Sequence, residues 1–170
     1  TRLVNVAIDR VANEIAAVRA EIVRYAGSDL LCYRAGSPAG LVEAQAAAWD
    51  PVLDWARETF GARFTLAEGV TFAAQPAESV AAIRAQVARY APPFALAALA
   101  TATAITGSVL LALALARGRL SADEAWAAAH VDEQWNAGQW GEDIEAKRRL
   151  AARRAEFDAA AKVLALLRET

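Results

Sequence analysis

The stretch FALAALATATAITGSVLLALALA, residues 94–116, decides the fold because it is long, apolar and free of charged residues. It is long enough to cross a bilayer. However, its many Ala, Thr, Ser and Gly residues make it only weakly hydrophobic, and Arg89 and Arg117 at its two ends give no charge asymmetry. A helix that is apolar on all sides is also typical of the centre of a globular bundle. We therefore predict one buried central helix over 94–116 without stable membrane insertion, and keep a small membrane-inserted helical protein as the alternative.

The segments around this run have the pattern of amphipathic helices. Steps of three and four residues give the first segment one apolar stripe, formed by Val4, Ile8, Val11, Ile15, Val18, Ile22 and Tyr25. Further helices are expected over 41–60, from Pro76 to the Pro92-Pro93 pair, and from about Asp143 to Leu167. In the last of these, the residues expected to point inward are Leu150, Phe157, Leu164 and Leu167.

One segment has the alternation of a β-hairpin instead. Phe64 and Leu66 precede Glu68-Gly69, and Val70 and Phe72 follow it. The predicted fold class is therefore mainly α: a helical bundle around a central apolar helix with one short β-hairpin. The length predicts one domain over 1–170. Because the sequence starts at Thr1 inside an apolar periodicity, we expect it to come from a longer protein.

Composition limits the classes of function. The 170 residues include 18 basic and 20 acidic ones, a net charge of −2, and no basic stripe of the kind that binds phosphate backbones. Nucleic acid is therefore not an expected partner. The single cysteine, Cys32, excludes an internal disulfide and fits a reducing compartment.

The residues for catalysis are sparse. His130 is the only histidine, and no cysteine pair has the spacing of a zinc site. Cys32 stands between Leu31 and Tyr33, as a buried small hydrophobe does. A hydrolase built on a Cys32–His130 dyad or on the acidic cluster near residue 132 stays open as a weak alternative. We predict a protein that is not an enzyme and needs neither a metal nor another cofactor.

The most distinctive polar segment is VDEQWNAGQWGED, residues 131–143. A capping box at Ser121 and Glu124 predicts a helix start, and we extend this helix until Asp132 and Glu133 fall in its last turns. Carboxylates are disfavoured there, because a helix C-terminus carries partial negative charge. A local rule broken without compensation suggests a functional role.

The aromatic residues of this segment point to a protein-binding surface. Trp135 and Trp140 follow the acidic pair, and tryptophan concentrates binding energy at interfaces. Glu142 lies at the start of the next helix, where negative charge is favourable. The predicted partner-binding residues are Asp132, Glu133, Trp135, Trp140 and Glu142.

A second motif, Trp49-Asp50-Pro51, is predicted to be structural. Proline is favoured at the first position of a helix, and aspartate is a good N-cap. We expect Trp49 to pack in the core and Asp50 to cap a helix that restarts at Pro51.

Four separated motifs also resemble a known family. They are YAGSDLLCYRA (25–35), AAAWDPVLDWARETFGARF (46–64), TGSVLLALALARGRL (106–120) and VDEQWNAGQWGED (131–143). In this order and spacing they resemble the C-terminal helical domain of the Atp12 family, the assembly chaperones of F1 ATP synthase. The resemblance runs across essentially the whole chain.

The resemblance implies a non-catalytic chaperone. It implies binding to the free α subunit of F1, whose β-facing surface the chaperone shields until the ring assembles. It also implies an N-terminal β-rich domain that this sequence lacks. The family's important acidic position falls on Asp132 or Glu133, and the tryptophan of its WDP motif on Trp49. The alanine bias suggests a bacterial member, hence the cytoplasm, whereas eukaryotic relatives would work in the mitochondrial matrix. The alternative that does not depend on this resemblance is a generic helical protein-interaction domain.

Overall fold

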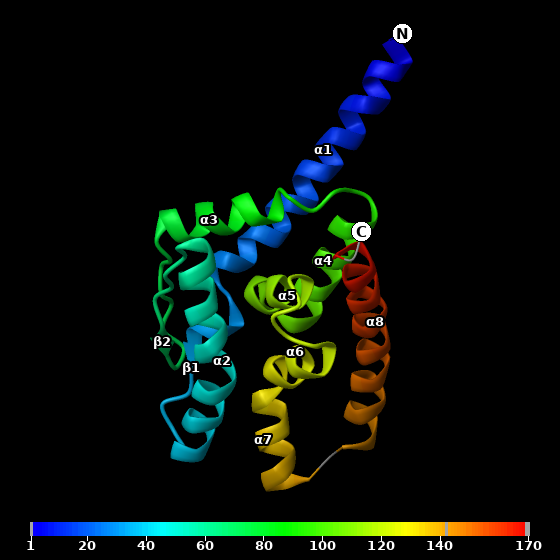
Figure 1. The fold of residues 1–170 in the computed structure, drawn as a ribbon. Coiled ribbons are helices and arrows are strands. Elements are labelled where there is room, and N and C mark those ends of the chain that lie inside the picture. Colours follow the sequence, from blue (N-terminus) through cyan, green and yellow to red (C-terminus); the bar gives the residue numbers. More distant parts are fainter. Residues whose placement is uncertain (1, 142, 169–170) are drawn as a thin grey trace.

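The computed structural model describes residues 2–141 and 143–168, which form a bundle of α-helices (Figure 1). Two 3-10 turns, Tyr25–Gly27 and Leu30–Cys32, connect the first helix to a short strand. The α-helices described are α1 (Arg2–Arg24), α2 (Ala39–Phe60), α3 (Ala77–Val87), α4 (Phe94–Thr106), α5 (Val109–Ala116), α6 (Ala122–Ala129), α7 (Val131–Trp140) and α8 (Ile144–Arg168). The mainly α fold class is thus confirmed.

The expected single helix over 94–116 is two helices, so that prediction was wrong in its bounds. Gly107 ends α4 with a φ of 69°, in the left-handed region that glycine adopts without strain. Ser108 then caps α5, its hydroxyl accepting a hydrogen bond from Leu111 N at 3.0 Å. A third residue fixes the break, because the buried Asp29 carboxylate accepts from Leu110 N at 3.1 Å. The apolar run therefore turns inside the core.

The prediction that this run is buried at the centre holds for its second half throughout. Every residue of α5 is buried. α4 packs along α8 and α1, while α5 contacts α2, α6 and α8 (Figure 1). Among the described residues, no helix combines the length and the apolar character that a membrane crossing requires.

The predicted β-hairpin around Glu68-Gly69 is wrong. The strand β2 (Ala67–Glu68) instead pairs in parallel with β1 (Tyr33–Arg34), far away in the sequence. Gly69 extends the pairing by donating its N–H to the carbonyl of Arg34 at 3.0 Å. Val70 and Phe72, whose alternation suggested a second strand, lie exposed. Their pattern misled because local alternation does not identify the pairing partner.

Two further helix predictions need correction. α2 runs without interruption from Ala39 to Phe60, so Pro51 lies inside the helix and Asp50 does not cap a new one. Pro51 is exposed, and the helix continues past it without the hydrogen bond that the missing N–H would have made. In α8, Phe157 and Leu164 are buried as predicted, but Leu167 is exposed.

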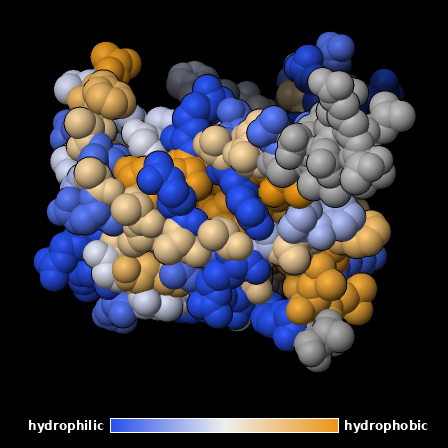
Figure 2. Space-filling view, turned by 90° about the horizontal axis from the view of Figure 1, so that it is seen from above, coloured by the Kyte–Doolittle hydropathy of each residue, from blue (hydrophilic) through white to orange (hydrophobic). Residues whose placement is uncertain are grey.

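The surface is mixed rather than uniformly polar. Seen from above, blue charged side chains lie beside and across orange apolar ones (Figure 2). The large exposed apolar side chains include Phe94 at the start of α4 and Leu166 and Leu167 at the end of α8.

Candidate functional site

The site begins with a change of direction at His130, which ends α6 and precedes α7. Its backbone leaves the helical region, with φ −120° and ψ 26°. The His130 ring is buried, stacks on Trp126 at 4.0 Å between centroids, and has Nδ1 2.8 Å from the carbonyl oxygen of Trp126. The side chain thus holds the corner between the two helices in place.

This corner reverses the expected position of the acidic pair. The helix that starts at Ser121 with its capping box ends at Ala129, and Asp132 and Glu133 lie in the first turn of α7. Our placement of them in the last turns was wrong. At a helix N-terminus negative charge is favourable, by about 0.3–1 kcal/mol at exposed sites. Asp132 and Glu133 therefore do not break the preference of helix ends for opposite charge, and this preference gives no sign of a functional role.

Asp132 has a structural partner. Its Oδ1 accepts a hydrogen bond from Gln45 Nε2 at 2.7 Å. The Oε1 of the same glutamine accepts from the backbone N–H of Ala35 at 2.8 Å. Gln45 is buried, so this chain ties α7 to α2 and to the segment after β1. Asp132 is only partly free to engage a partner.

Glu133 is different because its side chain faces solvent. It is exposed, and no hydrogen bond or ion pair joins its side chain to another described residue. Trp140, at the end of the same helix, is also open to solvent, with 88% of its surface exposed. Glu142 lies outside the described residues. Glu133 and Trp140 are thus the members of the predicted set with free side chains.

Trp135 covers the first turn of α2. A Cβ atom added at Gly40 would lie 2.4 Å from Cη2 of Trp135, so the indole rests directly on the glycine backbone. Trp135 is half-buried and forms one wall of an open groove. Glycine at position 40 is needed here for close approach.

The groove runs between α2 and the α6–α7 corner and has a volume of about 610 Å³. Small side chains form its floor, and Arg119, Glu124 and Gln134 bring polar groups to it. The apolar lining residues are Ala44, Ala47, Ala48, Pro51, Val52, Leu120, Ala127, Ala128, Val131 and Trp135. Sequence analysis missed the groove, although alanines spaced by three and four residues along α2 were a visible signal for a shallow helix face.

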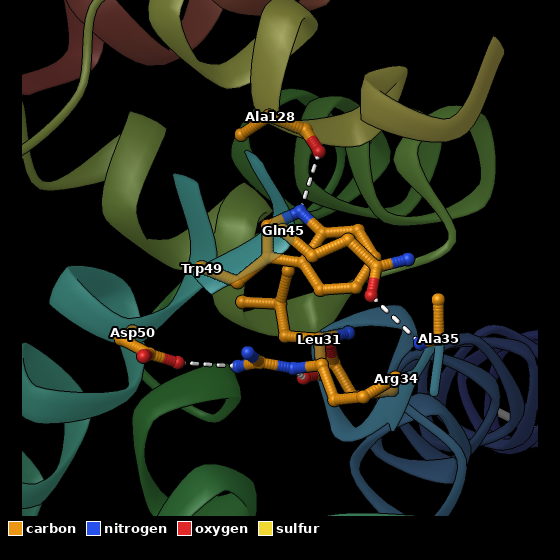
Figure 3. A network of polar contacts seen from close by, with 8 residues as sticks. Leu31, Arg34, Ala35, Gln45, Trp49, Asp50 and Ala128 are labelled. Atoms are coloured by element: carbon orange, nitrogen blue, oxygen red, sulfur yellow. Dashed lines mark hydrogen bonds and ion pairs between the residues drawn. The ribbon is translucent and has the colours of Figure 1, made fainter. Parts of the chain in front are cut away.

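Of the Trp49-Asp50-Pro51 motif, only Pro51 lines this groove. Trp49 is 1% exposed, and its Nε1 donates to the carbonyl of Ala128 at 2.7 Å (Figure 3). The Arg34 guanidinium lies 5.3 Å from the Trp49 ring centroid and bonds Asp50 Oδ1 at 2.7 Å (Figure 3). Trp49 is therefore a core residue, as predicted, while Asp50 is an ion-pair partner of Arg34.

The candidate nucleophile Cys32 lies in the core. Cys32 is fully buried, and burial raises the pKa of its thiol to about 12, with the Asp29 charge adding to the shift and Arg34 opposing it. The thiol is therefore protonated at neutral pH and a poor nucleophile. Across the part of the chain that the structure describes, no group of three His, Cys, Asp or Glu residues could hold a metal.

Comparisons with known proteins give a consistent result. The profile of the family described as ATP12 chaperone protein matches residues 1–57. The chain is 54% identical to a proposed chaperone from Agrobacterium tumefaciens, with a TM-score of 0.88; the match covers 96% of this chain and 61% of that one. It is 39% identical to Atp12 from Paracoccus denitrificans, with a TM-score of 0.86, over 97% of this chain and 70% of that one. An aspartate-to-lysine mutant of that Atp12 matches at 39% identity and a TM-score of 0.87, over 98% and 70% of the chains.

Proposed function

Because this chain belongs to the ATP12 family of chaperones, we propose that it is a non-catalytic assembly chaperone of the bacterial cytoplasm. In this proposal it binds the free α subunit of F1 ATP synthase and shields the β-facing surface until the ring assembles. The chain spans about 61% of the Agrobacterium relative and 70% of the Paracoccus one. The proposal therefore concerns what this helical part contributes to binding.

The observation that supports a binding role is the groove beside α7. It is open, its floor is built from small apolar side chains, and Trp135 forms one wall. A helix or extended segment of a partner could pack into such a floor. Glu133 and Trp140 lie on the same helix as Trp135 and expose side chains that are suited to an interface.

We assign different roles to the two acidic residues. Asp132 positions α7 through Gln45, whereas Glu133 is the carboxylate that meets the partner. A basic patch on the α subunit would be attracted by this carboxylate, and a lysine in its place would repel the patch.

The test measures aggregation of free F1 α subunit by light scattering, with and without the chaperone chain. We expect Glu133→Lys to bind the α subunit at least about tenfold more weakly, a loss of ~1.4 kcal/mol. Folding should survive, with a stability loss of about 0.3–1 kcal/mol from the helix N-terminus. The matched control is Glu156→Lys, which reverses an exposed charge on α8 and should protect as the unmodified chain does.

A second variant separates charge from structure. Asp132→Asn keeps an oxygen that can accept from Gln45 and removes the charge, so we expect protection close to that of the unmodified chain. Asp132→Lys loses the acceptor and should lower the melting temperature as well as the binding. Equal protection by Glu133→Lys and by the unmodified chain would remove Glu133 from the interface. Capture of unrelated unfolded proteins as readily as α would favour a generic interaction domain.

A further inference from the structure

A second concave site lies at the opposite end of the molecule from α7, where α3, α5 and α8 end. The loop after α3 passes close to the C-terminal end of α8 and to the start of α4 (Figure 1). Together they enclose a pocket of about 380 Å³. Its apolar lining comes from Ala95, Leu164 and Leu167, and Arg89, Arg117 and Arg168 stand around it.

The pocket is rich in positive charge, and no described carboxylate pairs with its arginines. None of the residues that line it is acidic, and within residues 2–141 and 143–168 none of its three arginines forms a salt bridge. Arg117 bonds the amide oxygen of Gln86, and Arg168 reaches the carbonyl of Leu115 at 3.4 Å. The exposed Arg89 side chain has no hydrogen-bond partner among the described residues.

Tyr90 shows that two of these charges converge. Burial raises the pKa of its phenol, and the charges of Arg117 and Arg89 oppose the rise. Both guanidiniums therefore lie near the Tyr90 hydroxyl. The Tyr90 hydroxyl could add a donor for a bound anion.

A purely structural explanation accounts for only part of this charge. Arginines near helix C-termini stabilise the partial negative charge of about half a unit at each end. α3, α5 and α8 end at this pocket, and each end contributes about half a negative charge. α4 begins there and contributes about half a positive charge. The helix ends thus offset about one of the three guanidinium charges. An excess of about two positive charges remains on the described residues.

We propose that this pocket binds a segment of a partner protein that carries a carboxylate next to an aliphatic side chain. Arg89 and Arg117 form bonds to the carboxylate, because the planar guanidinium matches its two oxygens. The aliphatic side chain packs against Leu164 and Leu167. The pocket is a recess that holds one or two side chains, which suits a peptide better than a flat lipid surface. This inference is independent of the proposed role of α7.

The experiment uses the full chain labelled with ¹⁵N-arginine and follows the Nε–Hε signals by NMR. The probe is the peptide acetyl-Gly-Glu-Leu-Asp-Gly-amide, and its amide counterpart acetyl-Gly-Gln-Leu-Asn-Gly-amide is the matched control. We expect saturable shifts of Arg89, Arg117 and Arg168 with a Kd of about 1 mM. The signal of Arg149, exposed on α8 and outside the pocket, should stay in place.

Two charge reversals locate the site. Arg89→Glu should weaken peptide binding about tenfold or more without loss of fold, because the Arg89 side chain is exposed and forms no hydrogen bond or salt bridge to another described residue. Arg149→Glu should leave binding unchanged. The proposal is overturned by equal binding of the amide peptide, by shifts of Arg149 as large as those of Arg89, or by no saturation at about 10 mM. Binding to vesicles of anionic lipid that depends on Arg89, without peptide binding, would overturn it in favour of a membrane.

Discussion

At the scale of the single residue, contacts rather than residue type distinguish structural from functional side chains. Asp132 and Glu133 are neighbours with the same charge, yet one is bonded to buried Gln45 and the other is exposed to solvent. The tryptophans divide in the same way. Trp49 is 1% exposed and Trp140 is 88% exposed, so only the latter is available to a partner.

Trp49 provides the first test. Trp49→Ala should lower the free energy of unfolding by about 3–5 kcal/mol, because it leaves a large cavity. Trp49→Phe should cost less, about 1–3 kcal/mol, since it mainly leaves the carbonyl of Ala128 without its donor. Urea unfolding followed by circular dichroism measures both. If Trp49→Ala keeps its melting temperature and loses only partner binding, Trp49 is a contact residue instead.

Asp29 provides a test through pH. The carboxyl is fully buried, and burial raises its pKa from 3.8 to about 6, against hydrogen bonds from Ser108 and from the N–H groups of Leu31, Leu110 and Val109. A folded-state pKa above the unfolded one means that the folded protein binds the proton more tightly. The resulting stability is fully present below pH 3.8 and is lost as pH rises through about 6.

This contribution amounts to about 3 kcal/mol, from the shift in pKa and ~1.36 kcal/mol per unit. Other carboxylates titrate in the same range, so the quantity to compare is the difference between the unmodified chain and Asp29→Asn. We expect the unmodified chain to lose stability relative to this variant between about pH 4 and 6. Urea unfolding at several pH values gives the two curves. Parallel curves would show that Asp29 titrates normally.

At the scale of the element, short breaks decide where a helix presents its residues. Gly107 and Ser108 divide the apolar run, and His130 divides the helix that the capping box at Ser121 begins. The second break moves Asp132 and Glu133 from a C-terminus to an N-terminus, which reverses the sign of their interaction with the helix dipole. A charge reversal there should therefore cost stability slightly instead of leaving it unchanged.

The apolar run provides a test at this scale. Leu113 in α5 is fully buried, so Leu113→Asp places an unpaired charge in the core and should unfold the domain. Ala97, in the first turns of α4 within the same run, is exposed. Ala97→Asp should therefore fold normally, because negative charge is favourable near a helix N-terminus. Thermal unfolding of both variants checks this, and a folded Leu113→Asp variant would contradict central burial.

At the scale of the whole molecule, stability and binding surface lie in different places. α5 is buried along its whole length, whereas Val131 is the one buried residue of α7. Segments with few buried contacts open locally at lower free energy than the core. The proposed interface thus lies on the less stable side of the bundle.

Hydrogen exchange measures this difference directly. The amides of α5 should exchange only through global unfolding, whereas those of residues 135–140 should exchange faster by local opening. Addition of free F1 α subunit should slow the second group, and a control protein should not. Equal protection of α5 and α7 in the free chain would indicate a single cooperative unit.

The sequence by itself determined the helical class, most helix bounds and the core position of Trp49. These depend on local chemistry: the periodicity of apolar residues, the capping box at Ser121 and the helix-breaking prolines after α3. The family resemblance also followed from the sequence, because it rests on the order of short motifs. The TGS sequence at the break between α4 and α5 also contains the local signals of a helix C-cap, Gly107, and of an N-cap, Ser108.

Only the tertiary structure decided what each site residue does. The pairing of Tyr33 with Ala67 and the bond from Gln45 to Asp132 depend on contacts between distant segments. Local patterns carry no information about such partners, since alternation and periodicity describe one segment at a time. The groove and the arginine pocket arise in the same way, because each is a space between helices that no single helix sequence defines.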